Sequence, residues 1–300
     1  MIQKEDISHW FQSLQDTICA SLEQADETGK FTEDKWQREE GGGGRTRILQ
    51  NGTIIEKGGV LFSAVHGPVP AFLTGENNQI KSTDTFYATG VSIVIHPNSP
   101  MVPIIHMNVR YFEMSNGIWW FGGGIDLTPH YVKEEDARFF HNTLKTVCDK
   151  HDPAYYEKFK KWADDYFFIP HRNETRGIGG IFFDKLSGKE TASKEKIFEF
   201  VKEVGSAFAP IYTSLMRKNF QEKFTPENKQ WQLLRRGRYV EFNLVYDKGT
   251  KFGLETNGRT ESILMSLPAN ASWLYDYKPH PTGKEAQTLS FLKKGIQWTI

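Results

Sequence analysis

The chain has 300 residues, and its 37 lysine and arginine residues balance its 37 aspartate and glutamate residues. This charge balance argues against a general nucleic-acid-binding protein, since such proteins carry a basic surface. Hydrophobic residues make up 38% of the chain and aromatic residues 14%, which is typical of a globular protein with a sizeable core. We expect a single domain over residues 1–300.

The cysteine content and the hydropathy pattern favour a cytoplasmic protein. Cys19 and Cys148 lie in helix-like segments far apart in the sequence, and no CxxC motif offers a zinc or thiol redox site. The first residues carry early acidic side chains and no apolar core, unlike a secretory signal or a transit peptide. No apolar run reaches the roughly 18 residues of a membrane-spanning helix.

The first half of the chain predicts one helix followed by hairpin-connected strands. Apolar residues recur at helical spacing over residues 3–26. A polar stretch and a glycine run then lead into strand-like segments, at residues 45–50, 53–65, 84–96, 102–114 and 117–126. Asn51-Gly52 and Asn116-Gly117 are hairpin signals between strands. Strands joined by such turns predict an antiparallel sheet.

Helical patterns dominate the second half. They occupy about residues 134–148, 155–168, 194–218 and 284–295, and Thr225-Pro226-Glu227 is typical of a further helix start. Strand-like segments are expected at residues 179–186, 237–247 and 261–268. The predicted fold is α+β, a large curved antiparallel sheet flanked on both sides by helices.

The strand pattern predicts a polar row beside a glycine turn. His106, Asn108 and Arg110 alternate with Ile105, Met107 and Val109, so the polar side chains share one face of a strand. On the preceding segment Ser92, Val94 and His96 share a face, and Asp126 follows the glycines at 122–124. These groups are suited to a flat anionic ligand. The alternative is the solvated face of an ordinary sheet.

Two arginines and four histidines are further candidates. Arg110 and Arg259 can each grip a carboxylate with two hydrogen bonds, although a structural salt bridge is the alternative. Neutral imidazoles can bind a divalent cation, and the candidates are His96, His106, His141 and His171. Their spacing matches no metal motif. Asp126 and, more weakly, Asp247 are candidate bases, although an aspartate after a glycine turn often only shapes the turn.

The glycine run at residues 41–44 precedes Arg45 and Arg47. It lacks the Gly-Lys-Ser/Thr ending of a phosphate-binding loop, so a nucleotide site has little support. We interpret the run as a mobile flap over the site, with a plain flexible linker as the alternative. The chain also lacks a dinucleotide-binding glycine fingerprint and a serine hydrolase elbow.

Five blocks resemble the oxygen-dependent coproporphyrinogen-III oxidases. They are GGGGRTRILQNGTIIEKGGVLFSAVHG (41–67), HPNSPMVPIIHMNVRYFE with WWFGGGIDLTPHY (96–131), HRNETRGIGGIFFD (171–184), GRYVEFNLVYDKGTKFGL (237–254) and NGRTESILMSLP (257–268). The likeness extends over most of the chain. It departs at the residues before Arg259, where relatives often carry other small residues.

The resemblance implies roles for individual residues. It implies that His106 donates a proton and that Asp126 contacts the pyrrole N–H groups or acts as a base. Substrate-binding positions would be Ser92, Asn108, Val109, Arg110, Asn257, Gly258 and Arg259. A divalent metal, manganese first, would be held by His96, His106, His141 and His171.

The resemblance also implies a reaction and an assembly. Two propionates of coproporphyrinogen III would become vinyl groups, giving protoporphyrinogen IX, carbon dioxide and hydrogen peroxide. Dioxygen would be the co-substrate, with no flavin, nicotinamide or haem. The family also implies a homodimer with its interface at about residues 239–274, where residues 261–268 are apolar at both strand parities. The alternatives are another histidine-metal oxygenase and a tetrapyrrole carrier without turnover.

Overall fold

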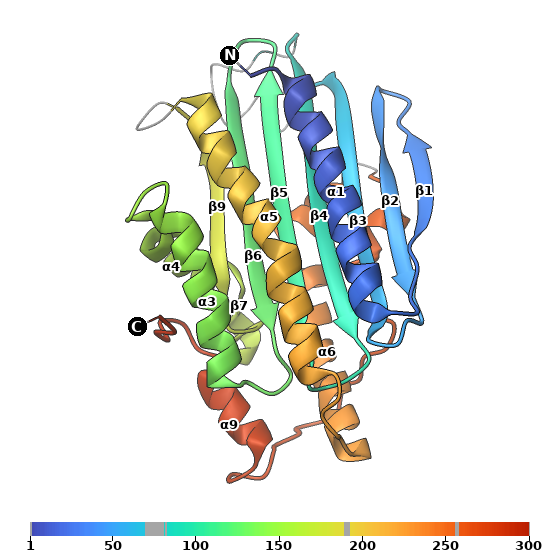
Figure 1. Cartoon of the computed structure of the whole chain (residues 1–300), viewed down its shortest axis with the longest axis vertical. Helices are drawn as coiled ribbons and strands as arrows, with labels where there is room; N and C mark the ends of the chain where they lie inside the picture. The colour runs from blue at the N-terminus through green and yellow to red at the C-terminus, as the bar shows by residue number, and fades with distance from the viewer. Residues whose placement is uncertain (1, 70–80, 82, 189–192, 256–257, 300) are drawn as a thin grey trace.

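The structure, a computed structural model, describes residues 2–69, 81, 83–188, 193–255 and 258–299. Within these residues, seven strands form one antiparallel sheet in the order β1-β2-β3-β4-β5-β6-β9 (Figure 1). The strands are β1 (Thr32–Gln37), β2 (Gly42–Gln50), β3 (Ile55–Pro68), β4 (Thr85–Pro97), β5 (Ile104–Met114), β6 (Trp119–Thr128) and β9 (Gly180–Leu186). A small ladder joins β7 (Phe168–Ile169) to β8 (Glu174–Thr175). The predicted antiparallel sheet is therefore confirmed.

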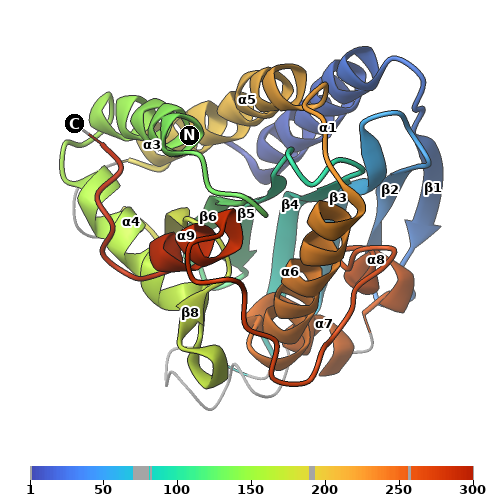
Figure 2. The same ribbon diagram turned by 90° about the horizontal axis from the view of Figure 1, so that it is seen from below.

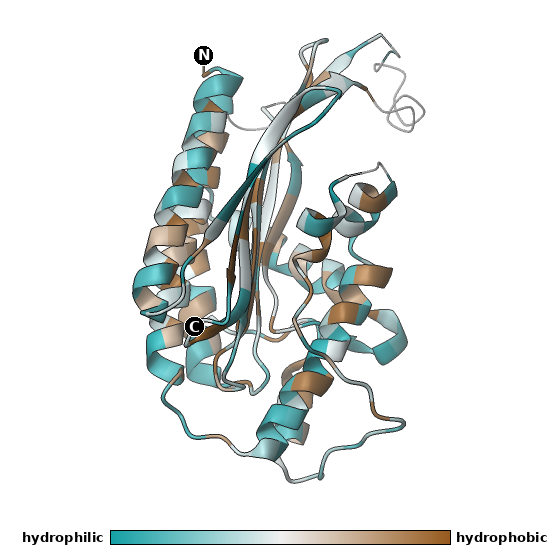
Figure 3. Ribbon diagram, turned by 90° about the vertical axis from the view of Figure 1, so that its right-hand side faces the viewer, coloured by the Kyte–Doolittle hydropathy of each residue, from teal (hydrophilic) through white to brown (hydrophobic). Residues whose placement is uncertain are grey.

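Helices cover both faces of the sheet, as predicted (Figure 2). One face carries α1 (Lys4–Asp26), α3 (Glu134–Asp149) and α5 (Lys194–Asn219), and the other carries α6 (Pro226–Val245), α7 (Lys248–Glu255) and α8 (Thr260–Leu264). The helix α4 (Tyr155–Tyr166) packs on β9, and α9 (Lys284–Phe291) lies near the carboxyl end of the chain. Figure 3 shows the sheet edge-on between the two helical layers. No described helix is long and apolar enough to cross a bilayer.

The main core lies between the sheet and α1, α3 and α5. Ile93 on β4 and Ile105, Met107 and Val109 on β5 are all fully buried on this side, which we call the core face. Alternate residues of the same strands point to the opposite side, which carries α6, α7 and α8 and which we call the site face. The predicted alternation along β5 is confirmed.

The predicted flap at the glycine run is wrong. Gly42 to Gly44 begin β2, which pairs with β1, a strand that the polar residues before the run were not expected to form. A Cβ atom on Gly43 would lie 2.3 Å from the carbonyl oxygen of Trp36, and one on Gly44 would lie 2.4 Å from that of Phe62. The glycines therefore serve the close approach of neighbouring strands.

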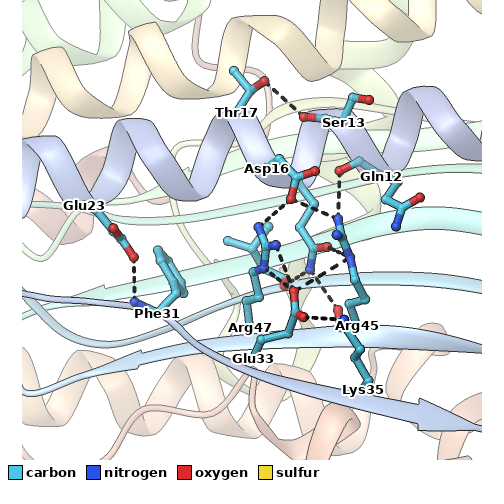
Figure 4. A network of polar contacts seen from close by, with 12 residues as sticks. Gln12, Ser13, Asp16, Thr17, Glu23, Phe31, Glu33, Lys35, Arg45 and Arg47 are labelled. Atoms are coloured by element: carbon cyan, nitrogen blue, oxygen red, sulfur yellow. Dashed lines mark hydrogen bonds and ion pairs between the residues drawn. The ribbon is translucent and has the colours of Figure 1, made fainter.

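The arginines after the glycine run fasten α1 to the sheet (Figure 4). Arg45 and Arg47 both contact Asp16 of α1, at 3.0 and 2.7 Å, and Arg47 also contacts Glu33 of β1 at 2.8 Å. These side chains lie on the core-face side, away from α6 to α8. They support the scaffold and do not reach the site face.

Two predicted strands are helical. Of the residues 237–247, those up to Val245 belong to α6, whose buried Trp231, Leu234, Tyr239 and Phe242 follow a helical spacing that strand propensity had obscured. Residues 261–268 form most of α8 and the turn after it. There the carbonyl oxygen of Leu267 accepts a hydrogen bond from the side chain of Lys57 at 2.8 Å, and residues 260–264 pair with no strand. Packing against the sheet therefore overrode the β-type composition.

A buried carboxylate joins the end of α1 to the β2–β3 hairpin. Asp26 has no exposed surface, and its oxygens accept backbone N–H bonds from Gly29 and Thr53 at 2.7 and 2.9 Å. They also accept from Ile54 and Ile55 at 2.8 and 2.7 Å. Asn51, with φ of 57°, confirms the predicted turn at this hairpin.

A second carboxylate fixes α6 across the site face. Glu241 accepts hydrogen bonds from Arg172 at 2.7 and 2.8 Å, from His171 at 2.7 Å and from Trp273 at 2.9 Å. Burial raises the pKa of Glu241, but the bonds from Arg172, His171 and Trp273 outweigh it and lower the pKa from 4.5 to about 2. The ionised carboxylate thus holds three chain segments together.

We predict that Asp26→Ala destabilises the fold by about 3 kcal/mol or more, because buried backbone donors lose their acceptor. Asp16→Ala is the matched control on the same helix, and its half-exposed ion pairs should cost about 1 kcal/mol or less. Urea unfolding gives both free energies. Equal losses in the two variants would contradict the structural role of Asp26.

We also predict that the stabilisation from Glu241 depends on pH. A carboxyl whose pKa is lowered on folding stabilises the native state above its unfolded pKa, and this contribution disappears as the pH falls through its folded pKa. The difference in free energy of unfolding between wild type and Glu241→Gln should stay constant above pH 5 and shrink toward pH 2. Urea titrations at several pH values measure it. A difference independent of pH would refute the prediction.

Candidate active site

The polar row predicted on β5 lies on the site face. His106, Asn108 and Arg110 are partly exposed, whereas the neighbouring Val109 is fully buried on the core face. The side chain of Val109 therefore does not lie beside those of Asn108 and Arg110, and its role in substrate binding stays a prediction. Ser92 is the register partner of Asn108 on β4, so this predicted residue joins the row.

The glycines of β6 make room beside the row. Gly124 pairs with Asn108, and Gly122 pairs with Arg110. A Cβ atom on Gly122 would lie 2.8 Å from Nε of Arg110 and 2.5 Å from Oδ1 of Asp184, so a larger residue would displace this ion pair. The glycine segment is therefore part of a strand rather than a turn, and its function is steric.

Arg110 is already hydrogen-bonded in this structure. Its Nη1 donates to Oδ1 of Asn108 at 2.8 Å, and its Nη2 donates to Oδ1 of Asp184 on β9 at 2.7 Å. The side chain of Arg110 remains 36% exposed. Sequence reasoning missed Asp184, although strand alternation within the segment 179–186 could have placed it on the site face. A ligand carboxylate would compete with Asp184 for the guanidinium.

His106 and Asp126 form a hydrogen-bonded pair. They are register partners on β5 and β6, and Nδ1 of His106 lies 2.8 Å from Oδ1 of Asp126. The imidazole is 21% exposed and the carboxylate only 1%, so His106 separates Asp126 from the open part of the site face. If Nδ1 carries the proton, the other ring nitrogen is left as an acceptor.

Arg176 completes this pair from the opposite side. Its Nη2 donates to both oxygens of Asp126, at 2.8 and 2.9 Å. Burial raises the pKa of Asp126, but the guanidinium of Arg176 and the hydrogen bond from His106 outweigh it and lower the pKa. Sequence reasoning missed Arg176, because it lies in the connection from β8 to β9, where no periodicity marks it. Asp126 thus stays ionised and behind His106.

Aromatic rings extend the site face beyond Arg110. Phe112 on β5 stacks on Trp120 of β6 at 4.3 Å and on Phe86 of β4 at 5.8 Å. Near β9, Tyr166 stacks on Phe182 at 4.1 Å. The polar row therefore lies between two partly exposed groups of flat side chains, which suits a ligand with a planar apolar body.

The four predicted metal ligands do not come together. His96 contacts the carbonyl oxygen of Ser266 at 2.8 Å, and His171 contacts Tyr246 and Glu241. His141, on α3, contacts Tyr156 and the carbonyl oxygen of Ile178. Across the ranges that the structure covers, no three His, Cys, Asp or Glu side chains are grouped as a metal site. These four residues therefore do not fit a single shared ion.

Two of these histidines have structural surroundings. Burial lowers the pKa of His96 to about 3, with a further contribution from the guanidinium of Arg236. Burial also lowers the pKa of His141 to about 3. Both imidazoles are thus neutral at physiological pH. The fixed positive charge of Arg236 near His96 disfavours an added cation there.

The second predicted carboxylate clamp lies at the start of α8. Arg259 forms an ion pair with Asp34 on β1, several strands away from Arg110 on β5. A Cβ atom on Gly258 would lie 2.7 Å from the carbonyl oxygen of Gly253, so the loop needs this glycine. Asn257 lies outside the described residues. Arg110 and Arg259 both lie on the site face, but they bind different carboxylates, Asp184 and Asp34.

Asp247, the weaker candidate base, serves a helix start. It accepts hydrogen bonds from the hydroxyl of Tyr166 at 2.9 Å and from the backbone N–H of Thr250 at 2.7 Å. The hydroxyl of Thr250 donates as well, at 2.9 Å. Asp247 therefore anchors α7 to α4 in this structure.

Comparisons with known proteins agree with the resemblance of the sequence blocks. Residues 6–298 match the model of the family described as coproporphyrinogen III oxidase. The chain is 52% identical over 293 residues to the mouse protein named oxygen-dependent coproporphyrinogen-III oxidase, mitochondrial, covering 94% of this chain and 66% of the mouse protein.

Two further relatives are named oxygen-dependent coproporphyrinogen-III oxidase. The Drosophila melanogaster protein is 49% identical, with 98% of this chain and 79% of the relative covered. The Prochlorococcus marinus (strain NATL2A) protein is 46% identical, with 95% and 88% covered. The chain spans about two thirds of the length of the mouse and human relatives. A match over nearly all of its own length shows that the chain belongs to the coproporphyrinogen III oxidase family.

Proposed function

We propose that this protein is an oxygen-dependent coproporphyrinogen-III oxidase that forms protoporphyrinogen IX. The observation that carries the proposal is the similarity, over 94–98% of this chain, to proteins of that name, at 46–52% identity in mouse, fly and Prochlorococcus. The chemistry of the site face supports it. Exposed arginine, a histidine–aspartate pair and flat aromatic side chains suit a planar ligand with several carboxylates.

The reaction balances without an added redox cofactor. Each reacting propionate loses its carboxylate as carbon dioxide and one hydrogen from the carbon beside the ring, which leaves a vinyl group. This oxidation releases two electrons and one proton. Together with one proton from solvent they reduce one dioxygen to hydrogen peroxide. The electron-rich tetrapyrrole supplies the electrons, so the protein must hold carboxylates, exclude water and move protons.

Arg110 is proposed to bind a propionate carboxylate. Its side chain is 36% exposed and its guanidinium bonds to Asp184, so a propionate would replace one carboxylate by another. Asn108, two residues before Arg110 on β5, and its register partner Ser92 on β4 offer further polar groups. Arg259, paired with Asp34 on the same face, is the proposed second clamp for a macrocycle that extends across the sheet.

His106 is proposed to handle the proton and Asp126 to orient it. Both oxygens of Asp126 already accept hydrogen bonds from the protein, so direct contact with the pyrrole N–H groups would require them to break. His106 is partly exposed, and an imidazole can serve as a general acid or base. His106 would thus transfer the proton, and Asp126 would orient the His106 imidazole.

A bound divalent metal ion, with manganese as the first choice, stays a prediction. The carboxylate-binding and proton-transfer roles proposed above do not depend on it. The cytoplasmic location also stays a prediction. The fly and Prochlorococcus relatives carry names without an organelle, whereas the mouse relative is named mitochondrial.

The homodimer is also part of the proposal. Its original support from strand parity in residues 261–268 fails, because residues 260–264 are helical. Other support comes from the proposed interface at 239–274, which contains large hydrophobic side chains that are about half exposed, namely Leu244, Val245, Phe252, Leu254, Trp273 and Leu274. Such a concentration is typical of a surface that another protein covers.

The decisive assay compares turnover of coproporphyrinogen III in air and without oxygen, read by product fluorescence after oxidation. We expect conversion only in air, with one peroxide for each carbon dioxide. Binding without turnover would favour a carrier instead. Turnover that stops on removal of a metal and returns with it would favour a histidine-metal oxygenase.

We predict that Arg110→Ala weakens substrate binding by roughly 2–5 kcal/mol, because a carboxylate loses its charged partner. The Michaelis constant and the turnover rate measure the effect. Arg138→Ala, which removes an exposed ion pair on α3, is the control and should leave both unchanged. An unaltered Michaelis constant and rate in Arg110→Ala would remove Arg110 from the site.

We predict that His106→Ala lowers turnover far more than affinity while leaving the fold intact, because the proton donor is lost but the carboxylate clamp remains. General acid–base groups contribute typically 10²–10⁴-fold, so a loss of about that size is expected. The exposed His9 on α1 gives the control variant His9→Ala. Full turnover in His106→Ala, or a loss that follows unfolding alone, would make His106 a structural residue.

We predict that the chain sediments as a dimer at micromolar concentration and that Leu274→Glu shifts it to monomer. A charge at this position would have to be buried at the interface. Phe139→Glu, at a similarly exposed site on α3 outside the proposed interface, should leave the dimer intact. A monomeric wild type would refute the dimer.

A further inference from the structure

Arg176 is a fully enclosed guanidinium directed at the candidate site. It is 3% exposed, and its Nη2 donates to both oxygens of Asp126 while its Nε lies 3.3 Å from Oδ2. Nη1 donates to Oδ1 of Asn243 on α6 at 2.8 Å. This two-pronged contact fixes the plane and the direction of the Asp126 carboxylate.

The backbone around Arg176 is also fixed. Its N–H donates to the carbonyl oxygen of Phe167 at 2.8 Å, and the N–H of Ile178 donates to that of Leu127 on β6 at 3.0 Å. A Cβ atom on Gly177 would lie 2.2 Å from the carbonyl oxygen of Leu127, so the connection runs tightly against β6. Arg176 therefore starts from a rigid support.

Three aromatic rings hold the guanidinium in place. Its Cζ lies 4.5 Å from the ring centre of Phe167, 4.6 Å from that of Tyr239 and 4.7 Å from that of Phe242. Phe167 also packs edge-on against the imidazole of His106, with ring centres 6.1 Å apart. Arg176 thus reaches His106 by two routes, through Asp126 and through Phe167.

We propose that Arg176 is a positioning residue that sets the orientation of the His106 imidazole through the Asp126 carboxylate and the Phe167 ring. This inference rests on the proposed oxidase function, since it concerns the proton step of that reaction. Arg176 lies behind Asp126 and His106, so it acts on the rate and does not touch the substrate. A displacement of the His106 imidazole that is small compared with the substrate is enough to slow a proton transfer, because the reacting atoms must be aligned.

The competing explanation is a purely structural ion pair. A buried ion pair is weak evidence for stability, because well-packed apolar residues often replace it without loss, whereas removing one partner is costly. Loss of stability in a variant therefore cannot separate the two explanations. The ratio of effects on kcat and KM can, because a structural defect does not select the chemical step.

The test compares Arg176→Lys and Arg176→Met with Arg236→Met, using full-length enzyme and coproporphyrinogen III in air. Arg236 is a matched control, since it is fully buried and paired with Glu56 but contacts neither Asp126 nor His106. Lysine keeps the charge but cannot present a planar fork. We expect kcat per folded enzyme to fall about 10²-fold in Arg176→Met with KM within about two-fold, and to fall less in Arg176→Lys. Arg236→Met should lose stability but keep kcat.

Each outcome decides the proposal. Wild-type kcat in a folded Arg176→Met enzyme overturns it, as does a rise in KM equal to the fall in kcat. If Arg176→Met does not fold, Arg176→Lys and Asn243→Ala carry the test, and wild-type kcat in both overturns it. The double variant Asp126→Asn/Arg176→Met should recover stability without recovering kcat. An inactive wild type refutes the oxidase function itself, and this inference with it.

Discussion

The two-residue period of the central strands is the constraint on which both the core and the candidate site depend. On β5 it buries Ile105, Met107 and Val109 and turns His106, Asn108 and Arg110 to the other side. A slip of one residue would exchange the two sets and bury an arginine in an apolar core. Because both faces carry helices, the same alternation builds a stable fold and presents the polar row.

The site face adds buried charge to this frame. Asp126 is compensated by Arg176, and Arg176 is enclosed by rings from α6 and by Phe167, which follows α4. Arg110 and Asp184 form a second, more exposed pair on the same face. The deep pair fixes an orientation, whereas the outer pair can exchange its carboxylate for one from a ligand. The distinction follows from burial, since desolvated pairs are costly to break and exposed pairs are not.

Local pattern predicted much of this structure, and its failures have physical causes. The hairpin signals and the alternation at His106 to Arg110 are short-range features, so the sheet and the polar row followed from them. Residues 237–247 are rich in strand-forming side chains, but those up to Val245 are helical, and Tyr239 packs against Val94 and Ile104 of the sheet. Arg176 and Asp184 come from distant segments, and only the tertiary arrangement brings them to Asp126 and Arg110. The close approach of β2 to its neighbouring strands at residues 42–44 could not be predicted from the sequence, because a glycine run is also typical of a flexible loop.

The most direct test of the account is a crystal structure of the protein with coproporphyrin III, the oxidised form of the proposed substrate. We expect the macrocycle on the site face, with a propionate within about 3 Å of the Arg110 guanidinium in place of Asp184. His106 would then face the edge of the ring. A porphyrin bound elsewhere, for example in the cavity that Arg172, Arg235 and Trp231 line, with Arg110 still bonded to Asp184, would contradict it.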